Sequence, residues 1–203
     1  MAPILVLYYS HHGSTKKLAD AIAQGIVSEG GEVWVRTVKS LHENNASGET
    51  AQSLSAPEVT RDELAQCSGL ALGSPTRFGN MAAAVKHFLD STSAQWIKGD
   101  LINKPACVFT STSSMHGGQE STLLSMMVPL LHHGMVMCGI PYSEPALHDT
   151  VTGGTPYGVT HVANSNNTAL SDHEKALCLA QGKRLAQLAK ALYSQFSENN
   201  DGA

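Results

Sequence analysis

A short polar segment near the N-terminus has residue types that suit an anion. Residues 10–15 have the sequence SHHGST and separate an apolar run at residues 4–9 from an amphipathic pattern that begins near Ser14. The apolar run is typical of a buried parallel strand. Backbone N–H groups in the first turn of a helix have no partner inside it and carry its positive end, so they favour an anion. The segment predicts a phosphate site at the end of the first strand, with an ordinary capped turn as the alternative.

The spacing of this segment argues against two common nucleotide motifs. It matches neither the phosphate loop G-x-x-x-x-G-K-[ST] nor the dinucleotide pattern G-x-G-x-x-G. The second apolar run, residues 33–38, does not end in the acidic residue that would hold an adenosine ribose. A small monophosphate cofactor therefore fits better than a dinucleotide.

The composition limits the class of protein. The chain has 203 residues, of which 42% are hydrophobic and 15% charged, and this predicts one domain over residues 1–203. A net charge of −4 without a run of Lys or Arg argues against nucleic acid as a main partner. No apolar stretch approaches the roughly 20 residues of a membrane span. The chain enters a strand almost at once, which predicts no signal peptide.

The cysteines show neither metal-binding nor redox spacing. No two of them form a C-x-x-C pair, and two lie in apolar runs typical of core strands. We therefore expect free thiols in a reducing cytoplasm. The cysteines are Cys67, Cys107, Cys138 and Cys178.

Strand and helix signals alternate along the chain. This alternation predicts an α/β fold with a doubly wound, five-stranded parallel sheet and helices on both faces. The predicted strands cover residues 4–9, 32–38, 69–73, 106–110 and 135–140. The predicted helices begin near residues 14, 58, 81, 119 and 171. Two polar segments, residues 39–57 and 141–168, are predicted to be loops.

Two further loops are polar and contain glycine, like residues 10–15. Residues 74–81 and 111–120 are polar and contain glycine, with aromatic or His side chains among them. In a sheet of this kind, ligands bind beyond the carboxyl ends of the strands. Glycine lets the main chain approach a ligand closely, and Phe78 offers a flat face. The three loops predict one site for a flat heteroaromatic ring, with plain surface turns as the alternative.

Five motifs together resemble the WrbA family, flavodoxin-like NAD(P)H:quinone oxidoreductases that bind FMN. The resemblance covers nearly the whole chain, and PTRFGN and GGTPYG are its most specific parts. The motifs are SxxGST at residues 10–15, GSPTRFGNM at 73–81, HGGQEST at 116–122, LHHGM at 131–135 and GGTPYG at 153–158.

The resemblance implies which residues bind FMN. The first group would hold the phosphate, the second would border the ring, and the third would hold the pyrimidine side of the ring. The first group is Ser10, His11, His12, Gly13, Ser14 and Thr15. The second is Pro75, Thr76, Arg77, Phe78, Gly79 and Asn80. The third is Ser111, Thr112, Ser113, Ser114, Met115, His116, Gly117 and Gly118.

The resemblance also implies substrate and catalytic residues. His133 matches the second His of the family's HHGM, which lies near the flavin. Trp96 matches an aromatic residue that covers the ring from a neighbouring chain, which implies an oligomer, usually a tetramer. His12 replaces a Tyr that often contacts the nicotinamide cofactor in the family. Residues 113–115 also depart from the family pattern, and this is expected to alter hydrogen bonding to the flavin.

The implied reaction is ping-pong hydride transfer from NADH or NADPH to a quinone. An FMN-dependent electron carrier or regulatory protein is the alternative, but the modest charge does not resemble a carrier's docking surface. His133 has its own alternative role, a helix C-terminal residue that interacts with the helix dipole. Adjacent His pairs point in different directions, so no metal site is predicted. Lys16 and Lys17 are interpreted as a solvated helix face.

Overall fold

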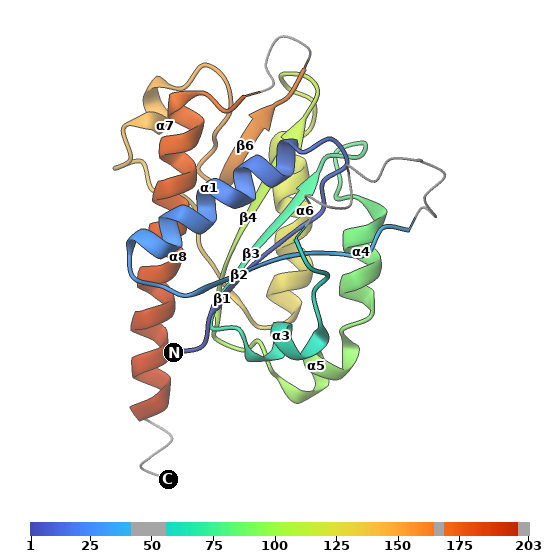
Figure 1. The fold of residues 1–203 in the computed structure, drawn as a ribbon, viewed down its shortest axis with the longest axis vertical. Helices are drawn as coiled ribbons and strands as arrows, with labels where there is room; N and C mark the ends of the chain where they lie inside the picture. The colour runs from blue at the N-terminus through green and yellow to red at the C-terminus, as the bar shows by residue number, and fades with distance from the viewer. Residues whose placement is uncertain (42–55, 165–168, 199–203) are drawn as a thin grey trace.

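The computed structural model describes residues 1–41, 56–164 and 169–198 (Figure 1). A parallel sheet runs through the molecule in the order β2-β1-β3-β4-β5, and β6 also pairs with β4. The predicted doubly wound, flavodoxin-like sheet is confirmed. The strands are β1 (Ile4–Tyr8), β2 (Val33–Thr37), β3 (Leu70–Pro75), β4 (Pro105–Thr112), β5 (Val136–Met137) and β6 (Gly158–Val162).

The sheet position beyond β4 is shared by two segments, which differs from the prediction. β5 pairs only with the first two residues of β4, Pro105 and Ala106. β6 pairs with residues 108–112 farther along the same strand. The predicted fifth strand at residues 135–140 is therefore too long, and the predicted loop at 141–168 contains β6. After β5 the chain leaves the sheet, and it returns at β6. The segment that leaves and the segment that returns lie side by side, because the backbone N–H of Ile140 bonds to the carbonyl of Pro156.

Helices cover both faces of the sheet, as predicted. In Figure 1, α1 and α8 lie on one face and α6 lies on the other. The short α5 was not predicted. The predicted loop at residues 39–57 lies largely outside the described residues. The helices are α1 (Ser14–Ser28), α3 (Arg61–Gln66), α4 (Ala83–Asp90), α5 (Ser93–Lys98), α6 (Gln119–His132), α7 (Ala146–Asp149) and α8 (Asp172–Glu198).

Two hydrophobic cores result from the alternation of side chains along each strand. In β1, Ile4 and Val6 pack into the core under α1 and α8. Leu5 and Leu7 point into the opposite core, under α3, α4 and α6. A strand buried on both faces must be apolar throughout, which explains the continuous run in the sequence. Among the described residues, no helix is both long and apolar enough to cross a membrane.

Candidate cofactor site

A cavity of about 330 Å³ lies where β1, β3, β4 and β6 end. Its described lining carries two His, one Lys and one Arg but no carboxylate, so its charge favours an anion. The lining residues are Ser10, His11, His12, Ser14, Thr15, Lys17, Pro75, Thr76, Arg77, Ser111, Thr112, Ser113, Ala163 and Asn164. The three predicted loops therefore meet at one cavity.

The first loop presents the start of α1 to this cavity. Gly13 is the N-cap residue, and its φ of 86° lies in the left-handed region that glycine adopts without strain. Its N–H donates to the Ser10 hydroxyl at 3.0 Å. No side chain caps the helix, and its first turn holds no acidic residue. The first-turn N–H groups thus remain suited to a phosphate, which is the group the sequence predicts here.

Side-chain hydroxyls connect the loops to one another. Thr15 Oγ1 and Ser111 Oγ lie 2.9 Å apart and join the first turn of α1 to β4. Thr76 Oγ1 and Thr122 Oγ1 lie 2.5 Å apart and join the loop after β3 to α6. These bonds hold the walls of the cavity in place before any ligand enters.

The loop after β3 makes a tight turn that exposes an aromatic ring. Arg77 and Asn80 exchange backbone hydrogen bonds of 2.7 and 3.1 Å. Phe78 and Gly79 between them have φ values of 54° and 76°. A positive φ is unusual for a bulky residue, and strain of this kind concentrates at functional sites. The Phe78 side chain is fully exposed, at 107% of the reference area, so its ring is free to stack against a flat ligand.

The remaining predicted cofactor residues do not line the cavity. Gly13, Phe78, Gly79 and Asn80 shape its loops or its rim. Residues 114–118 form a turn closed by the Gly117 N–H, which bonds to the Ser114 carbonyl at 3.1 Å. Their contacts with FMN stay predictions.

His133 and Trp96 lie in a different cavity, of about 450 Å³, between α4, α5 and α6. A third cavity, of about 610 Å³, adjoins these two cavities. It shares His11 and Arg77 with the first cavity and Asn80 with the second. Within one chain, the structure therefore does not bring His133 or Trp96 into the first cavity.

Hydrogen bonds fix the tautomer of His133, the C-cap residue of α6. The Thr92 hydroxyl donates to the Leu89 carbonyl at 2.7 Å, so Nε2 of His133 must donate to Thr92 Oγ1, which lies 2.9 Å away. Nδ1 is buried and has no partner among the described residues. Burial, together with the nearby His132, lowers the pKa of His133, so the ring is neutral near pH 7.

Trp96 closes the C-terminal end of α6. Its indole N–H donates to the His132 carbonyl at 2.8 Å, which satisfies one of the last carbonyls of the helix. The ring is still 56% exposed, and Val128 and Leu131 on α6 are also exposed. These apolar side chains form a surface suited to another molecule.

Three residues that line the first cavity were not predicted from the sequence. Lys16 forms an ion pair with Asp20 at 2.6 Å, which fits a solvated face, but Lys17 lines the cavity. Lys17 is three residues after Ser14 and so lies on the same helical face, a signal that was available. Ala163 and Asn164 follow β6, and their position could not be found while β6 was taken for a loop.

The sheet order, the uncapped helix and the basic cavity define a class, flavodoxin-like proteins that bind FMN. Residues 3–147 match the family model described as NADPH-dependent FMN reductase. A protein of Chromohalobacter salexigens named NAD(P)H dehydrogenase (quinone) is 40% identical, with 95% of this chain and 99% of that protein covered. A protein of the same name from Geotalea daltonii is 42% identical, with 93% and 97% covered. The chain belongs to this FMN reductase family, together with the NAD(P)H dehydrogenases (quinone).

Solved structures show the same fold at lower identity. The WrbA-like flavodoxin of Agrobacterium tumefaciens has a TM-score of 0.65 and 20% identity, covering 94% of this chain and 99% of that one. A flavodoxin from the domain Archaea has a TM-score of 0.62 and 21% identity, covering 93% and 99%. These structures confirm the fold, whereas the family model and the relatives at 40% and 42% identity confirm the family resemblance in the sequence.

Replacing Phe78 should raise the stability of the protein and lower its activity. Asn adopts a positive φ more readily than Phe, so Phe78→Asn should raise the free energy of unfolding by about 1 kcal/mol. Quinone reduction should fall because the exposed ring is lost. Urea denaturation of Phe78→Asn beside Phe78→Leu, which removes the ring and keeps the strain, checks this. Equal stability of the two variants would contradict the assignment of strain.

The lowered pKa of His133 predicts a pH-dependent stability. Below about pH 6.5 the unfolded chain binds a proton at this residue that the folded chain resists, so stability falls as the pH falls. His133→Gln should remove part of this loss between pH 7.5 and 5.5, as measured by urea denaturation. The same change at the exposed His87 is the control. A pH dependence identical to that of the unmodified protein would refute the burial effect.

Proposed function

We propose that this protein is an FMN-dependent NAD(P)H:quinone oxidoreductase. The observation that carries the proposal is the uncapped start of α1 facing a basic cavity where the loops after β1, β3 and β4 meet. The names of the relatives at 40% and 42% identity support the reaction. When bound, FMN would supply hydride transfer between the nicotinamide and the quinone.

The chain's residues would divide the binding of FMN between them. The first-turn N–H groups of α1 and the hydroxyls of Ser10, Ser14 and Thr15 suit the phosphate. His11, Lys17 and other basic lining groups add positive charge around it. Thr76, Arg77 and residues 111–118 would border the ring.

The substrate region would be the open side of the cavity. Phe78 stands fully exposed on the turn after β3, where it can stack against a flat ring. His12 in the cavity lining would contact the nicotinamide cofactor. A single surface that takes NADH or NADPH and then the quinone accounts for a ping-pong order.

We propose that Trp96 and His133 act on this region from a neighbouring copy in a homotetramer. Within one chain they lie in the separate cavity between α4, α5 and α6. The exposed Trp96, Val128 and Leu131 offer an apolar surface for that contact. His133 bonds to Thr92, the N-cap residue of α5, and so holds the helix that carries Trp96.

We also propose a cytoplasmic location. All four cysteines are free and buried, as predicted. Free thiols are typical of a reducing compartment, and the nicotinamide donors are available there.

Steady-state oxidation of NADH and NADPH with benzoquinone or menadione tests the function. Trp96→Ala should lower kcat/KM for the quinone about tenfold through lost stacking, while FMN affinity stays unchanged. Ile97→Ala, at an exposed position of the same helix, is the matched control and should behave like the unmodified protein. Bound FMN without turnover would favour the electron-carrier alternative. Equal kinetics for Trp96→Ala and the control would exclude the proposed role of Trp96.

A further inference from the structure

A fully buried His–Glu pair joins β6 to α8. His161 and Glu174 are both 0% exposed, and Nδ1 of the imidazole lies 3.1 Å from each carboxylate oxygen. The carboxylate also accepts the N–H of Ser171 at 2.7 Å. Because every group around the carboxylate donates to it, the ionised form of Glu174 fits this site, with a proton on Nδ1 of His161. An isolated buried carboxylate is costly, so the donors from His161 and Ser171 are what allow Glu174 to stay buried.

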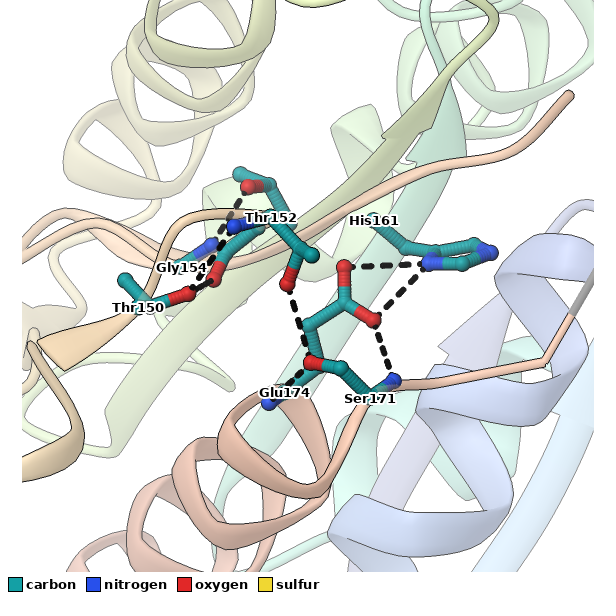
Figure 2. A network of polar contacts seen from close by, with 8 residues as sticks. Thr150, Thr152, Gly154, His161, Ser171 and Glu174 are labelled. Atoms are coloured by element: carbon teal, nitrogen blue, oxygen red, sulfur yellow. Dashed lines mark hydrogen bonds and ion pairs between the residues drawn. The ribbon is translucent and has the colours of Figure 1, made fainter. Parts of the chain in front are cut away.

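The surrounding network closes this pair off from water (Figure 2). Ser171 Oγ accepts the N–H of Glu174 at 3.1 Å, which completes a capping box at the start of α8. Thr152 Oγ1 lies 2.9 Å from Ser171 Oγ. A Cβ on Gly153 would lie 2.6 Å from a Glu174 carboxylate oxygen, so glycine is needed for the loop to pass this close.

The second imidazole nitrogen is buried and has no partner among the described residues. Figure 2 shows Nε2 at the far end of the ring from Glu174. A buried polar atom without a partner is costly, and such exceptions call for an explanation. With the proton on Nδ1, Nε2 carries only a lone pair, so no donor is left unpaired at this end of the ring.

The position of His161 in the sheet places it beside the cofactor cavity. It is in register with Ser111 on β4, and residues in register on parallel strands point to the same face of the sheet. The Ser111 hydroxyl meets Thr15 in the first turn of α1, and both residues line the cavity. Two residues after His161, the chain reaches Ala163 and then Asn164, which line it as well.

We propose that His161 is a positioning residue for the phosphate of the flavin, an inference that rests on the proposed function. Its hydrogen bonds to Glu174 tie β6 to the start of α8, and His161 lies in register with Ser111, which meets Thr15 at the cavity. The pair also fixes the end of β6, and with it the cavity wall at Ala163 and Asn164. The ligand class that the basic cavity favours is a phosphate monoester, and the pair holds the wall around it without touching it.

Comparing FMN with riboflavin isolates the charge, because riboflavin lacks the phosphate. His161→Gln keeps an N–H near Glu174 but replaces the rigid ring that joins β6 to the carboxylate with a flexible amide. We expect the dissociation constant for FMN, measured by quenching of flavin fluorescence, to rise about tenfold, and that for riboflavin to change less than about twofold. His173→Gln, on the same turn of α8 but outside the network, should leave both constants unchanged.

A second variant keeps the test decisive if His161→Gln fails to fold by circular dichroism. His161→Gln/Glu174→Gln removes the buried carboxylate together with the ring and should fold, with FMN affinity reduced and riboflavin affinity retained. An equal loss for the two flavins, or no loss for either, would overturn the role of His161. Failure of the unmodified protein to bind either flavin would instead refute the proposed function.

Discussion

The constraint on which the proposed site depends is the uncapped start of α1, whose backbone N–H groups favour an anion. The helix is fixed to the sheet through Leu18, Ile22 and Ile26, all fully buried in the core shared with α8. Its first turn can therefore move little, and its N–H groups point to where the parallel strands end. Gly13 at the N-cap supplies no side chain to satisfy them. In the proposed complex, the FMN phosphate would complete this helix terminus and set where the rest of the mononucleotide lies.

The other parts of the proposed site are arranged around the start of α1. The loops after β3 and β4 are held by hydroxyl pairs, and Phe78 is held away from the protein in a strained turn. The proposed phosphate site is thus built within one chain, whereas the aromatic surface proposed for substrates is open to solvent. Trp96 lies in the separate cavity between α4, α5 and α6, and its proposed role requires that copies of the chain assemble. The buried pair of His161 and Glu174 links β6 to α8 beside the proposed phosphate side of the cavity.

Local signals in the sequence were sufficient to predict β1 and α6. Residues 4–8 are buried on both faces and therefore apolar throughout, and α6 was predicted with its observed ends, Gln119–His132. β6 was missed because its five residues lie among Gly, Pro and Thr and because it pairs with a strand about 50 residues earlier. The separation of His133 and Trp96 from the cavity could not be predicted either, since it depends on how α5 and α6 pack. The pairing of His161 with Glu174 is likewise a tertiary contact that no local pattern indicates.

The most direct test of the account is a comparison of amide chemical shifts in the ¹⁵N-labelled protein on addition of FMN and of riboflavin. The account predicts that FMN shifts the amides of residues 11–15 strongly. It also predicts that riboflavin leaves these amides nearly unchanged while still shifting residues in the loops after β3 and β4. FMN binding that left the amides at the start of α1 unperturbed would contradict the central claim.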